Sequence, residues 1–413
     1  MTKARDLANG ASALSAVSAT ELGYLDGVTS AVQTQIDGKQ AVNANVSTTE
    51  LGYLDGVTSS IQTQLNAKQA VVSGVDDTEI GYLNGVTSAI QTQLNQKSEY
   101  VAGKNKIING DFGIWQRGTS FSSATGLGYT ADRWFLSWSG TTTIAVSRQT
   151  FTPGTAPVAG YESSHFARIA RTAGSADDYF LQRIEDCRTF AGQTITVSFW
   201  AKANAATTIS QVYAAPNAGS GGSGAPSGGG SFSGIAVTTS WARYSTTFTL
   251  NSLTGTTIGT GSYVEIVFKL GSAMGNVTLD LWGVQCEAGS VATPFQTATG
   301  TIQGELAACQ RYFQKSYDQS VTPGTGSDNG AIFGCRPNGG AYLQGIHKVT
   351  MRGVPTIVAY SPTTGTSGKV RNYSSAADEN ASTGFIGEYG VKFAGTTGSN
   401  DLMGVHYTAS AEL

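Results

Sequence analysis

The sequence predicts a mixed, mostly β protein, in which a segmented α-helical stalk is followed by two β-sandwiches. A 29-residue repeat with helix-start signals predicts the stalk. Further along the chain, apolar and polar residues alternate with a period of two, which is typical of sandwich strands. The composition agrees, because 53 of the 413 residues are glycine and only 13% are charged. The net charge of −3 also argues against electrostatic binding of nucleic acid, which needs a basic surplus.

The repeat near the N-terminus is the strongest signal. Its copies are 20–40 (TELGYLDGVTSAVQTQIDGKQ), 49–69 (TELGYLDGVTSSIQTQLNAKQ) and 78–98 (TEIGYLNGVTSAIQTQLNQKS). Each copy matches the next at 16 of 21 positions. Such self-similarity indicates that one structural unit is built three times.

Each copy begins with the same helix-start chemistry. A cap residue is followed three positions later by a glutamate that can reach back to the cap's own N–H, which is a capping box. The predicted cap residues are Ser18, Ser47 and Asp76. A glycine then ends a short first helix, at Gly27, Gly56 and Gly85. A second helix is expected next, capped by Ser30, Ser59 and Ser88.

The apolar residues of each copy form one narrow stripe, such as Val57, Ile61 and Leu65. A stripe this narrow cannot bury itself within one chain, and helices this short are marginal alone. A monomeric solenoid is disfavoured, because polar residues such as Gln33 and Gln35 leave too little apolar surface. Three sister chains around a threefold axis would place every stripe at the centre. The predicted core of this segmented trimeric stalk comprises Leu22, Leu25, Val28, Val32, Ile36, Leu51, Leu54, Val57, Ile61, Leu65, Ile80, Leu83, Val86, Ile90 and Leu94.

The repeat, residues 18–98, resembles the stalk repeats of bacteriophage tail fibres. That resemblance implies a homotrimer in the virion, at the tail, neck or another external appendage, assembled in the host cytoplasm. It also implies that residues 1–17 anchor the chain to other phage structural proteins and that the C-terminal domains face the host. We expect no signal peptide and no membrane insertion, because no basic segment precedes an apolar stretch at Met1 and no long apolar run occurs.

Residues 99–104 are predicted to be a hinge, and residues 105–299 a β-sandwich domain. Alternation with one apolar parity predicts its antiparallel strands, as in Ile195, Val197 and Phe199. The segments NKIINGDFGIWQRGTSF (105–121) and VTLDLWGVQCEAGSVATPFQ (277–296) resemble the first and last parts of jelly-roll domains found in phage fibres and some carbohydrate-binding modules. The resemblance implies a jelly-roll domain that is similar to carbohydrate-binding modules.

Parity also selects candidate glycan-binding residues. If the aliphatic residues face the core, Trp200 and Trp282 face away from it with Glu265 and Asp280. Exposed aromatic rings beside polar groups can stack on sugar rings and bond their hydroxyls. The alternative that the two tryptophans form the trimer interface or pack under a loop stays open. Tyr373, in a C-terminal loop, is a further candidate.

The jelly-roll resemblance implies one optional metal, a structural calcium ion. Asp111 and Glu287 are the carboxylates that suit it. A single carboxylate near a turn is more often a turn or cap residue. No cofactor is therefore expected.

Residues 300–413 are predicted to form a smaller β-sandwich at the distal tip. Residues 301–317 resemble the helical start of the terminal domain of many phage fibres, and 347–370 (HKVTMRGVPTIVAYSPTTGTSGKV) resemble its strand and turn. The predicted receptor-contacting loops are 320–329 and 372–383.

Three functions fit this organisation. The favoured one is adhesion to the host surface by multivalent binding to polysaccharide or lipopolysaccharide. The second is a structural neck, collar or capsid appendage with little receptor specificity. The third, a polysaccharide depolymerase, is disfavoured because the acidic pairs Glu185–Asp186 and Asp378–Glu379 are adjacent, and adjacent strand residues point to opposite faces. We therefore expect no enzyme.

Overall fold

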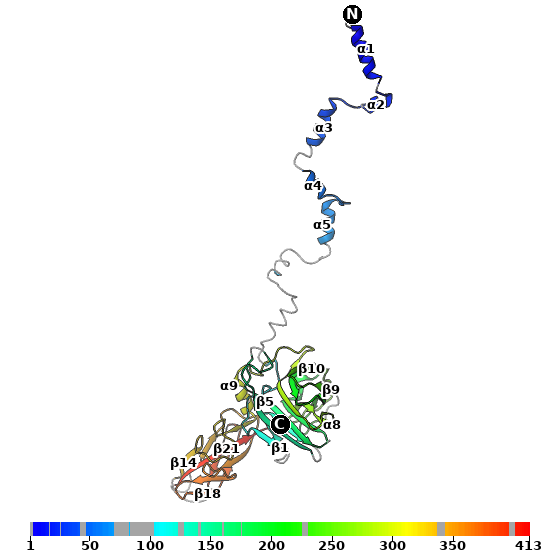
Figure 1. Ribbon diagram of the computed structural model, residues 1–413. Coiled ribbons are helices and arrows are strands. Elements are labelled where there is room, and N and C mark those ends of the chain that lie inside the picture. Colours follow the sequence, from blue (N-terminus) through cyan, green and yellow to red (C-terminus); the bar gives the residue numbers. More distant parts are fainter. Residues whose placement is uncertain are drawn as a thin grey trace. The chain divides into compact units, whose positions relative to one another are not determined.

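The computed structural model describes residues 3–15, 17–24, 26–41, 47–69, 82, 103–122, 128–138, 142–158, 161–174, 176–224, 230–336, 343–395 and 401–413. The chain divides into two compact units, Met1–Thr87 and Ser88–Leu413. Figure 1 shows helices in the first unit and two β-rich bodies in the second. Because both β-rich parts belong to one unit, the predicted boundaries at 98, 104 and 299 stay predictions.

The N-terminal unit contains short helices: α1 (Lys3–Leu14), α2 (Ala19–Gly23), α3 (Val32–Ala41), α4 (Thr48–Gly52) and α5 (Ile61–Gln69). Both capping boxes in the described part are confirmed. The Ser18 N–H donates to Glu21 Oε2 at 2.7 Å, and the Glu21 N–H donates to Ser18 Oγ at 3.2 Å. Ser47 and Glu50 repeat this pair of bonds at 2.7 Å and 3.2 Å. The third predicted box, at 76–79, lies outside the described residues.

The start of the second helix differs from the prediction by one residue. Helix α5 begins at Ile61, so Ser60 rather than Ser59 directly precedes it, and Ser60 Oγ accepts a hydrogen bond from the Thr63 N–H at 3.3 Å. The Ser59 carbonyl instead accepts from the Gln64 side chain at 3.1 Å. The predicted left-handed conformation is confirmed at Gly27 (φ +90°) and Gly56 (φ +86°). The first helices nevertheless end four residues before these glycines, at Gly23 and Gly52, so the predicted helix ends were wrong.

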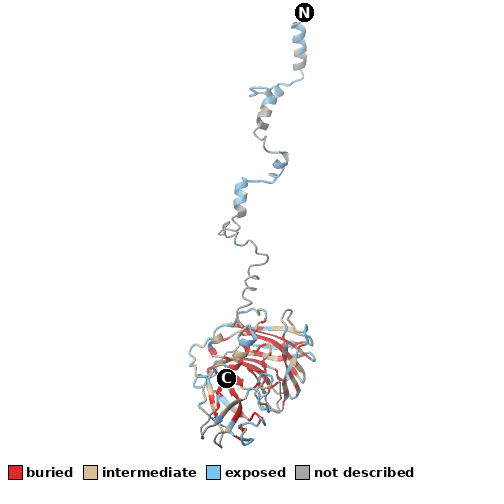
Figure 2. Ribbon diagram, turned by 90° about the vertical axis from the view of Figure 1, so that its left-hand side faces the viewer, coloured by how far each residue is buried: buried red, intermediate tan, exposed pale blue. Residues whose placement is uncertain are grey.

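The predicted stalk stripe is exposed in the single chain. Eight of its members have described side chains, and their exposed fractions run from 37% at Val57 to 56% at Leu65. These eight are Leu22, Val28, Val32, Ile36, Leu54, Val57, Ile61 and Leu65. The side chains of Leu25, Leu51, Ile80, Leu83, Val86, Ile90 and Leu94 lie outside the described part. Figure 2 shows the contrast between these exposed helices and the buried interiors of the β-rich parts. Among the described residues, no helix is both long and apolar enough to cross a membrane.

The first β-rich part consists of two six-stranded antiparallel sheets, with orders β1-β4-β5-β12-β7-β10 and β2-β3-β6-β11-β8-β9. Its elements are β1 (Ser120–Ser122), β2 (Gly128–Tyr129), β3 (Trp134–Trp138), β4 (Thr143–Thr150), β5 (His165–Ala173), β6 (Asp178–Glu185), η4 (Cys187–Phe190), β7 (Thr194–Ala203), β8 (Thr207–Asn217), β9 (Ser231–Val237), β10 (Ala242–Thr249), β11 (Tyr263–Lys269), α8 (Gly271–Met274) and β12 (Thr278–Ala288). We call the sheet that contains β12 the first sheet. The predicted parity is confirmed, because Ile195, Val197 and Phe199 are fully buried in the core cluster of this domain.

The second β-rich part is organised around its last strand. Its elements are α9 (Ile302–Gln310), β13 (Phe313–Lys315), β14 (Ile332–Arg336), β15 (Leu343–Ile346), β16 (Thr356–Tyr360), β17 (Lys369–Asn372), β18 (Ala377–Asn380), β19 (Ser382–Gly384), β20 (Gly390–Ala394) and β21 (Asp401–Ser410). Strand β21 pairs with β13, β14, β16 and β17, and a smaller sheet has the order β15-β20-β19. Met403, Val405 and Tyr407 of β21 are buried, which confirms the predicted closing strand.

Buried charges join the two β-rich parts. Glu412 forms ion pairs with Arg133, whose side chain is 1% exposed, and with Arg117. The guanidinium of Arg133 also lies 3.5 Å from the ring centroid of Tyr312. Because a buried guanidinium needs a partner, these contacts fix the terminal segment against the first sandwich.

Candidate functional site

The two predicted platform tryptophans are buried, so their assignment as exposed sugar-stacking residues was wrong. They lie opposite each other on β7 and β12, and their exposed fractions are 8% for Trp200 and 0% for Trp282. Their strand parity was predicted correctly, since they belong to a cluster separate from the main core. The two tryptophans instead pack under neighbouring segments of the same chain, which is one of the alternatives that the sequence left open.

Aromatic residues from neighbouring segments cover this pair. The ring centroid of Trp282 lies 4.8 Å from that of Phe295 and 5.6 Å from that of Tyr161. Phe151 and Phe166 complete the cluster, with their ring centroids 4.7 Å apart. The first sheet is therefore buried on both faces here, which leaves no open aromatic platform.

The two predicted acidic partners lie on different sheets. Asp280, on β12, is 3% exposed and accepts two hydrogen bonds from Arg168 at 2.7 Å and 2.9 Å. Glu265, on β11 of the second sheet, pairs with Arg183 at 2.9 Å. Both carboxylates are thus engaged by protein cations. The structure does not bring them together.

Tyr373 is far along the chain in the C-terminal part. It is half-buried, packs against Phe333 with ring centroids 5.6 Å apart, and donates its hydroxyl proton to Asp328. This bond joins the two predicted receptor loops, 320–329 and 372–383. The five predicted glycan-binding residues therefore lie in three separate places: Trp200, Trp282 and Asp280 on the first sheet, Glu265 on the second sheet, and Tyr373 in the C-terminal part.

The calcium hypothesis gains no support at Glu287. This carboxylate is fully buried, pairs with Lys104 at 3.3 Å, and accepts hydrogen bonds from Gln285 and from Thr293. Protein donors therefore occupy both of its oxygens. No group of three or more potential metal ligands occurs among the described residues.

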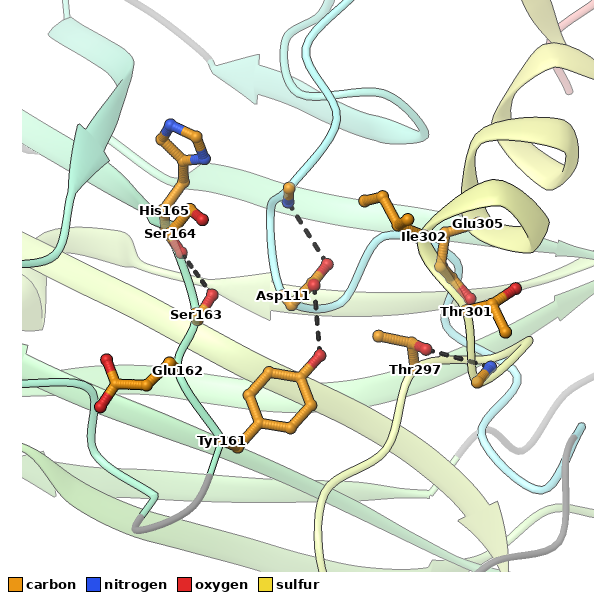
Figure 3. A pocket seen from close by; sticks show the side chains of 12 residues that line it. Asp111, Tyr161, Glu162, Ser163, Ser164, His165, Thr297, Thr301, Ile302 and Glu305 are labelled. Atoms are coloured by element: carbon orange, nitrogen blue, oxygen red, sulfur yellow. Dashed lines mark hydrogen bonds between the residues drawn. The ribbon is translucent and has the colours of Figure 1, made fainter. Parts of the chain in front are cut away.

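Asp111 belongs instead to a polar hollow on the first sandwich, which we call the Asp111 hollow (Figure 3). Its cavity volume is about 590 Å³. Three segments that are distant in sequence form its walls: the turn at Asp111, residues 161–165, and residues 297–305 at the start of α9. A cavity of this size can hold a small sugar unit.

The Asp111 carboxylate lies at the centre of this hollow. It accepts hydrogen bonds from the Gly113 N–H at 3.3 Å and from the Tyr161 hydroxyl at 3.4 Å. Both bonds are long, so they leave acceptor capacity on the carboxylate oxygens. Burial raises the pKa of Asp111 above its usual value, and the pKa of the Tyr161 hydroxyl is raised by burial and by the Asp111 charge.

Glu305 also lines the hollow, but its carboxylate serves the fold. It is 2% exposed and accepts from the Asn109 N–H at 2.7 Å, the Thr299 N–H at 2.7 Å and the Thr299 hydroxyl at 2.9 Å. Burial nevertheless raises the pKa of Glu305. The Asn109 bond connects α9 to the first sandwich, and the two Thr299 bonds hold the segment that leads into α9.

The rest of the lining is rich in hydroxyl groups. Ser164 and Thr301 are exposed in it, while His165 and Glu162 point away from Asp111 in Figure 3. Burial, and then the charge of Arg148, lowers the pKa of His165, which favours the neutral imidazole. The hollow therefore offers one central carboxylate with acceptor capacity, that of Asp111, and several neutral hydrogen-bonding groups.

The sequence pointed to Asp111 as a possible calcium ligand but did not predict the hollow around it. Tyr161 and Thr301 follow no periodic pattern, and only the folded chain brings them to the first turn of the domain. Apart from their residue types, nothing in the sequence indicates that Tyr161 and Thr301 lie close to Asp111.

No family model and no curated protein sequence matches this chain. Among solved structures, the enzymatically active domain of bacteriophage CBA120 tailspike protein 4 is 20% identical with a TM-score of 0.30, and the match covers 45% of this chain and 21% of the tailspike chain. The family 11 carbohydrate-binding module of Clostridium thermocellum is 12% identical with a TM-score of 0.27, covering 38% and 90%. The xylan-binding domain CBM22-1 of Paenibacillus barcinonensis Xyn10C is 12% identical with a TM-score of 0.26, covering 46% and 98%. All three similarities are distant.

Proposed function

We propose that this chain is a homotrimeric fibre protein of a phage virion that adheres to the host surface by multivalent glycan binding. The observation that carries the binding part is the Asp111 hollow, whose carboxylate and hydroxyl groups suit the hydroxyls of a sugar. A carboxylate oxygen can accept hydrogen bonds from two sugar hydroxyls, and these charge-assisted bonds are stronger than neutral ones.

The stalk supports the fibre part of the proposal. Its repeats resemble phage-fibre stalks, and the described stripe exposes apolar side chains such as Ile61 and Leu65 to about half of their full extent. Contiguous exposed apolar surface commonly marks an interface between chains. Three parallel copies would bury the stripe and carry three sets of C-terminal domains, while residues 1–17 would attach to other virion proteins.

One observation favours a second function, that of a structural appendage with little receptor specificity. The tryptophan pair that would have formed an open sugar platform is buried, so the sandwich has no such platform at Trp200 and Trp282. In that case the trimeric stalk would act as a spacer, and the Asp111 hollow would bind no glycan.

We propose binding rather than hydrolysis at the hollow. Cleavage of a glycosidic bond needs two carboxyl groups that act on the same bond. Glu305 is the buried carboxyl near Asp111, and three protein donors already hold it. Its geometry suits a structural role.

A glycan array of bacterial surface polysaccharides and lipopolysaccharides tests the proposal with the full chain. We expect binding that falls at least tenfold in Asp111→Asn, which keeps the shape but removes the charge. Glu162→Gln is the matched control, because this exposed carboxylate lies at the same hollow and points away from its centre. No binding by the wild-type trimer to any array component would favour the structural appendage, and release of reducing sugar would favour a depolymerase.

A further inference from the structure

A second hollow lies on the outer face of the small sheet β15-β20-β19 in the C-terminal part. Its volume is about 480 Å³, and we call it the tip groove. Phe385 and Tyr389 line it, together with Gln344 of β15 and Lys392 of β20. Gln344 and Lys392 are direct cross-strand partners, so both side chains rise from the same face of the sheet.

The rings of Phe385 and Tyr389 are largely exposed to solvent and contribute little to the core of the domain. The exposed fractions are 85% for Phe385 and 72% for Tyr389. The main chain of Tyr389 is held in place, because its carbonyl accepts a hydrogen bond from the His347 N–H at 3.0 Å. Exposure of both rings on an ordered turn therefore creates an apolar surface that is available for binding.

The backbone at Phe385 adds a second observation. Its φ is +47°, in the left-handed region that bulky residues rarely adopt. Such conformations persist where the surrounding structure imposes them, and they concentrate at binding sites. Here the unfavourable backbone presents a large ring to solvent and buries nothing within the chain.

Gly387 leaves open space in the lining of the groove. A Cβ added at Gly387 would meet no atom within 4 Å, and the φ of this glycine is not in the left-handed region. The space next to the Gly387 Cα is therefore open, since glycine has no side chain to fill it. A substitution there would fill the groove without disturbing the backbone.

The charge in the groove is positive. Lys392 is the only charged side chain among the residues that line it, all of which are described, and its ammonium lies 4.9 Å from the centroid of the Phe385 ring. A cation over an aromatic face is stabilised there, so its position is defined relative to the ring. An anion bound beside the Phe385 ring would lie within reach of this ammonium.

We propose that the tip groove binds an acidic saccharide, one whose ring carries a carboxylate, as in a hexuronic acid. The apolar C–H face of the sugar ring stacks on Phe385 and Tyr389. The Gln344 amide hydrogen-bonds its hydroxyls, and Lys392 pairs with its carboxylate. This site is separate from the Asp111 hollow and has a different charge preference.

The competing occupant of an exposed aromatic surface is a second copy of the same chain. Ile346, 70% exposed on the same sheet face, would join such an interface. Polar Gln344 and the charged Lys392 in the lining of the groove argue for the saccharide instead, because charged residues are depleted at the cores of interfaces between subunits. The two occupants differ in their response to mutation.

Binding of the full chain to immobilised oligogalacturonate and oligoglucuronate tests the proposal, with the methyl ester of each as a matched neutral probe. We expect the acids to bind at least tenfold more tightly than their esters. Phe385→Ala and Gly387→Leu should each weaken acid binding at least tenfold. Lys392→Gln should abolish the preference for acid over ester. Ile346→Ser, outside the lining, is the matched control and should change neither.

Each other outcome overturns the proposal. It fails if neither acid binds to the wild-type chain, if acid and ester bind equally, or if Phe385→Ala leaves acid binding unchanged. A lower molar mass of Phe385→Ala by light scattering would assign the groove to contacts between copies. Asp111→Asn should retain uronate binding, so failure at the tip groove and failure at the Asp111 hollow can be told apart.

Discussion

Replacing Trp282 by alanine should destabilise the first sandwich strongly. The side chain is fully buried, and four aromatic neighbours surround it, with ring centroids 4.8 to 6.2 Å away. Truncation of a buried tryptophan costs about 3–5 kcal/mol. Because the indole N–H has no hydrogen-bond partner among the described residues, its removal offsets about 1 kcal/mol or more of that loss. The free energy of unfolding should therefore fall by about 3 kcal/mol.

Urea denaturation of the full chain, followed by far-ultraviolet circular dichroism, measures this loss. With a denaturant slope of about 2 kcal/mol/M, the transition midpoint of the domain should fall by about 1.5 M. Trp282→Phe is the matched control, because it keeps an aromatic ring, leaves a smaller cavity and removes the unpaired N–H; it should cost clearly less than the alanine replacement. If Trp282 were an exposed sugar platform, alanine would shift stability by less than about 0.5 kcal/mol. A midpoint shift below about 0.3 M would refute the burial argument.

Three further predictions concern the stalk, a buried carboxyl and the joint between the β-rich parts. Ile61→Asp should place charges in the proposed stalk core and lower the mass measured by light scattering from about three times the 42.7 kDa of one chain; an unchanged mass would contradict the assigned stripe. Burial raises the pKa of Asp132 from 3.8 to about 6, so the folded chain binds this proton more tightly than the unfolded chain does. This group should therefore destabilise the fold by up to about 3 kcal/mol above about pH 6, and the penalty should fade as the pH drops towards 4. Urea midpoints between pH 4.5 and 7 should show this trend in the wild type but not in Asp132→Asn, and parallel profiles would disprove it. Glu412→Ala should leave the Arg133 guanidinium without its carboxylate and cost about 3–5 kcal/mol, seen as a lower midpoint and faster proteolysis between the β-rich parts. Unaltered cleavage and midpoint would count against the ion pair.

Local chemistry made much of the fold predictable. The capping boxes at Ser18 and Ser47 depend on residues three apart, and the left-handed turn at Gly27 depends on one residue. Strand parity likewise needs only neighbours, so the buried face of Ile195 and Val197 could be read directly. Such signals are short-range, which is why sequence reasoning captures them.

The sites were harder to predict, because they depend on what covers a face. The alternation of apolar and polar residues correctly predicted on which face of β12 Trp282 lies. The side chains that bury Trp282 on that face, Tyr161 and Phe295, come from segments without periodicity. The tip groove depends on how Phe385 and Tyr389 emerge from a turn beside two strands. These arrangements join residues with no regular spacing, so only the folded chain reveals them.

Oligomeric assembly and weak binding are complementary parts of the proposed function. A hollow that contacts one or two sugar units gives a dissociation constant on the order of millimolar, about −4 kcal/mol. Linking several such sites raises the effective affinity by about 10² to 10⁴ when the sites can engage together. Burial of the exposed stripe that includes Ile61 and Leu65 would hold three tips on one stalk. One shallow binding site alone would bind its sugar too weakly for stable attachment. Three such sites on one stalk would together hold the fibre firmly on a surface that repeats the same sugar.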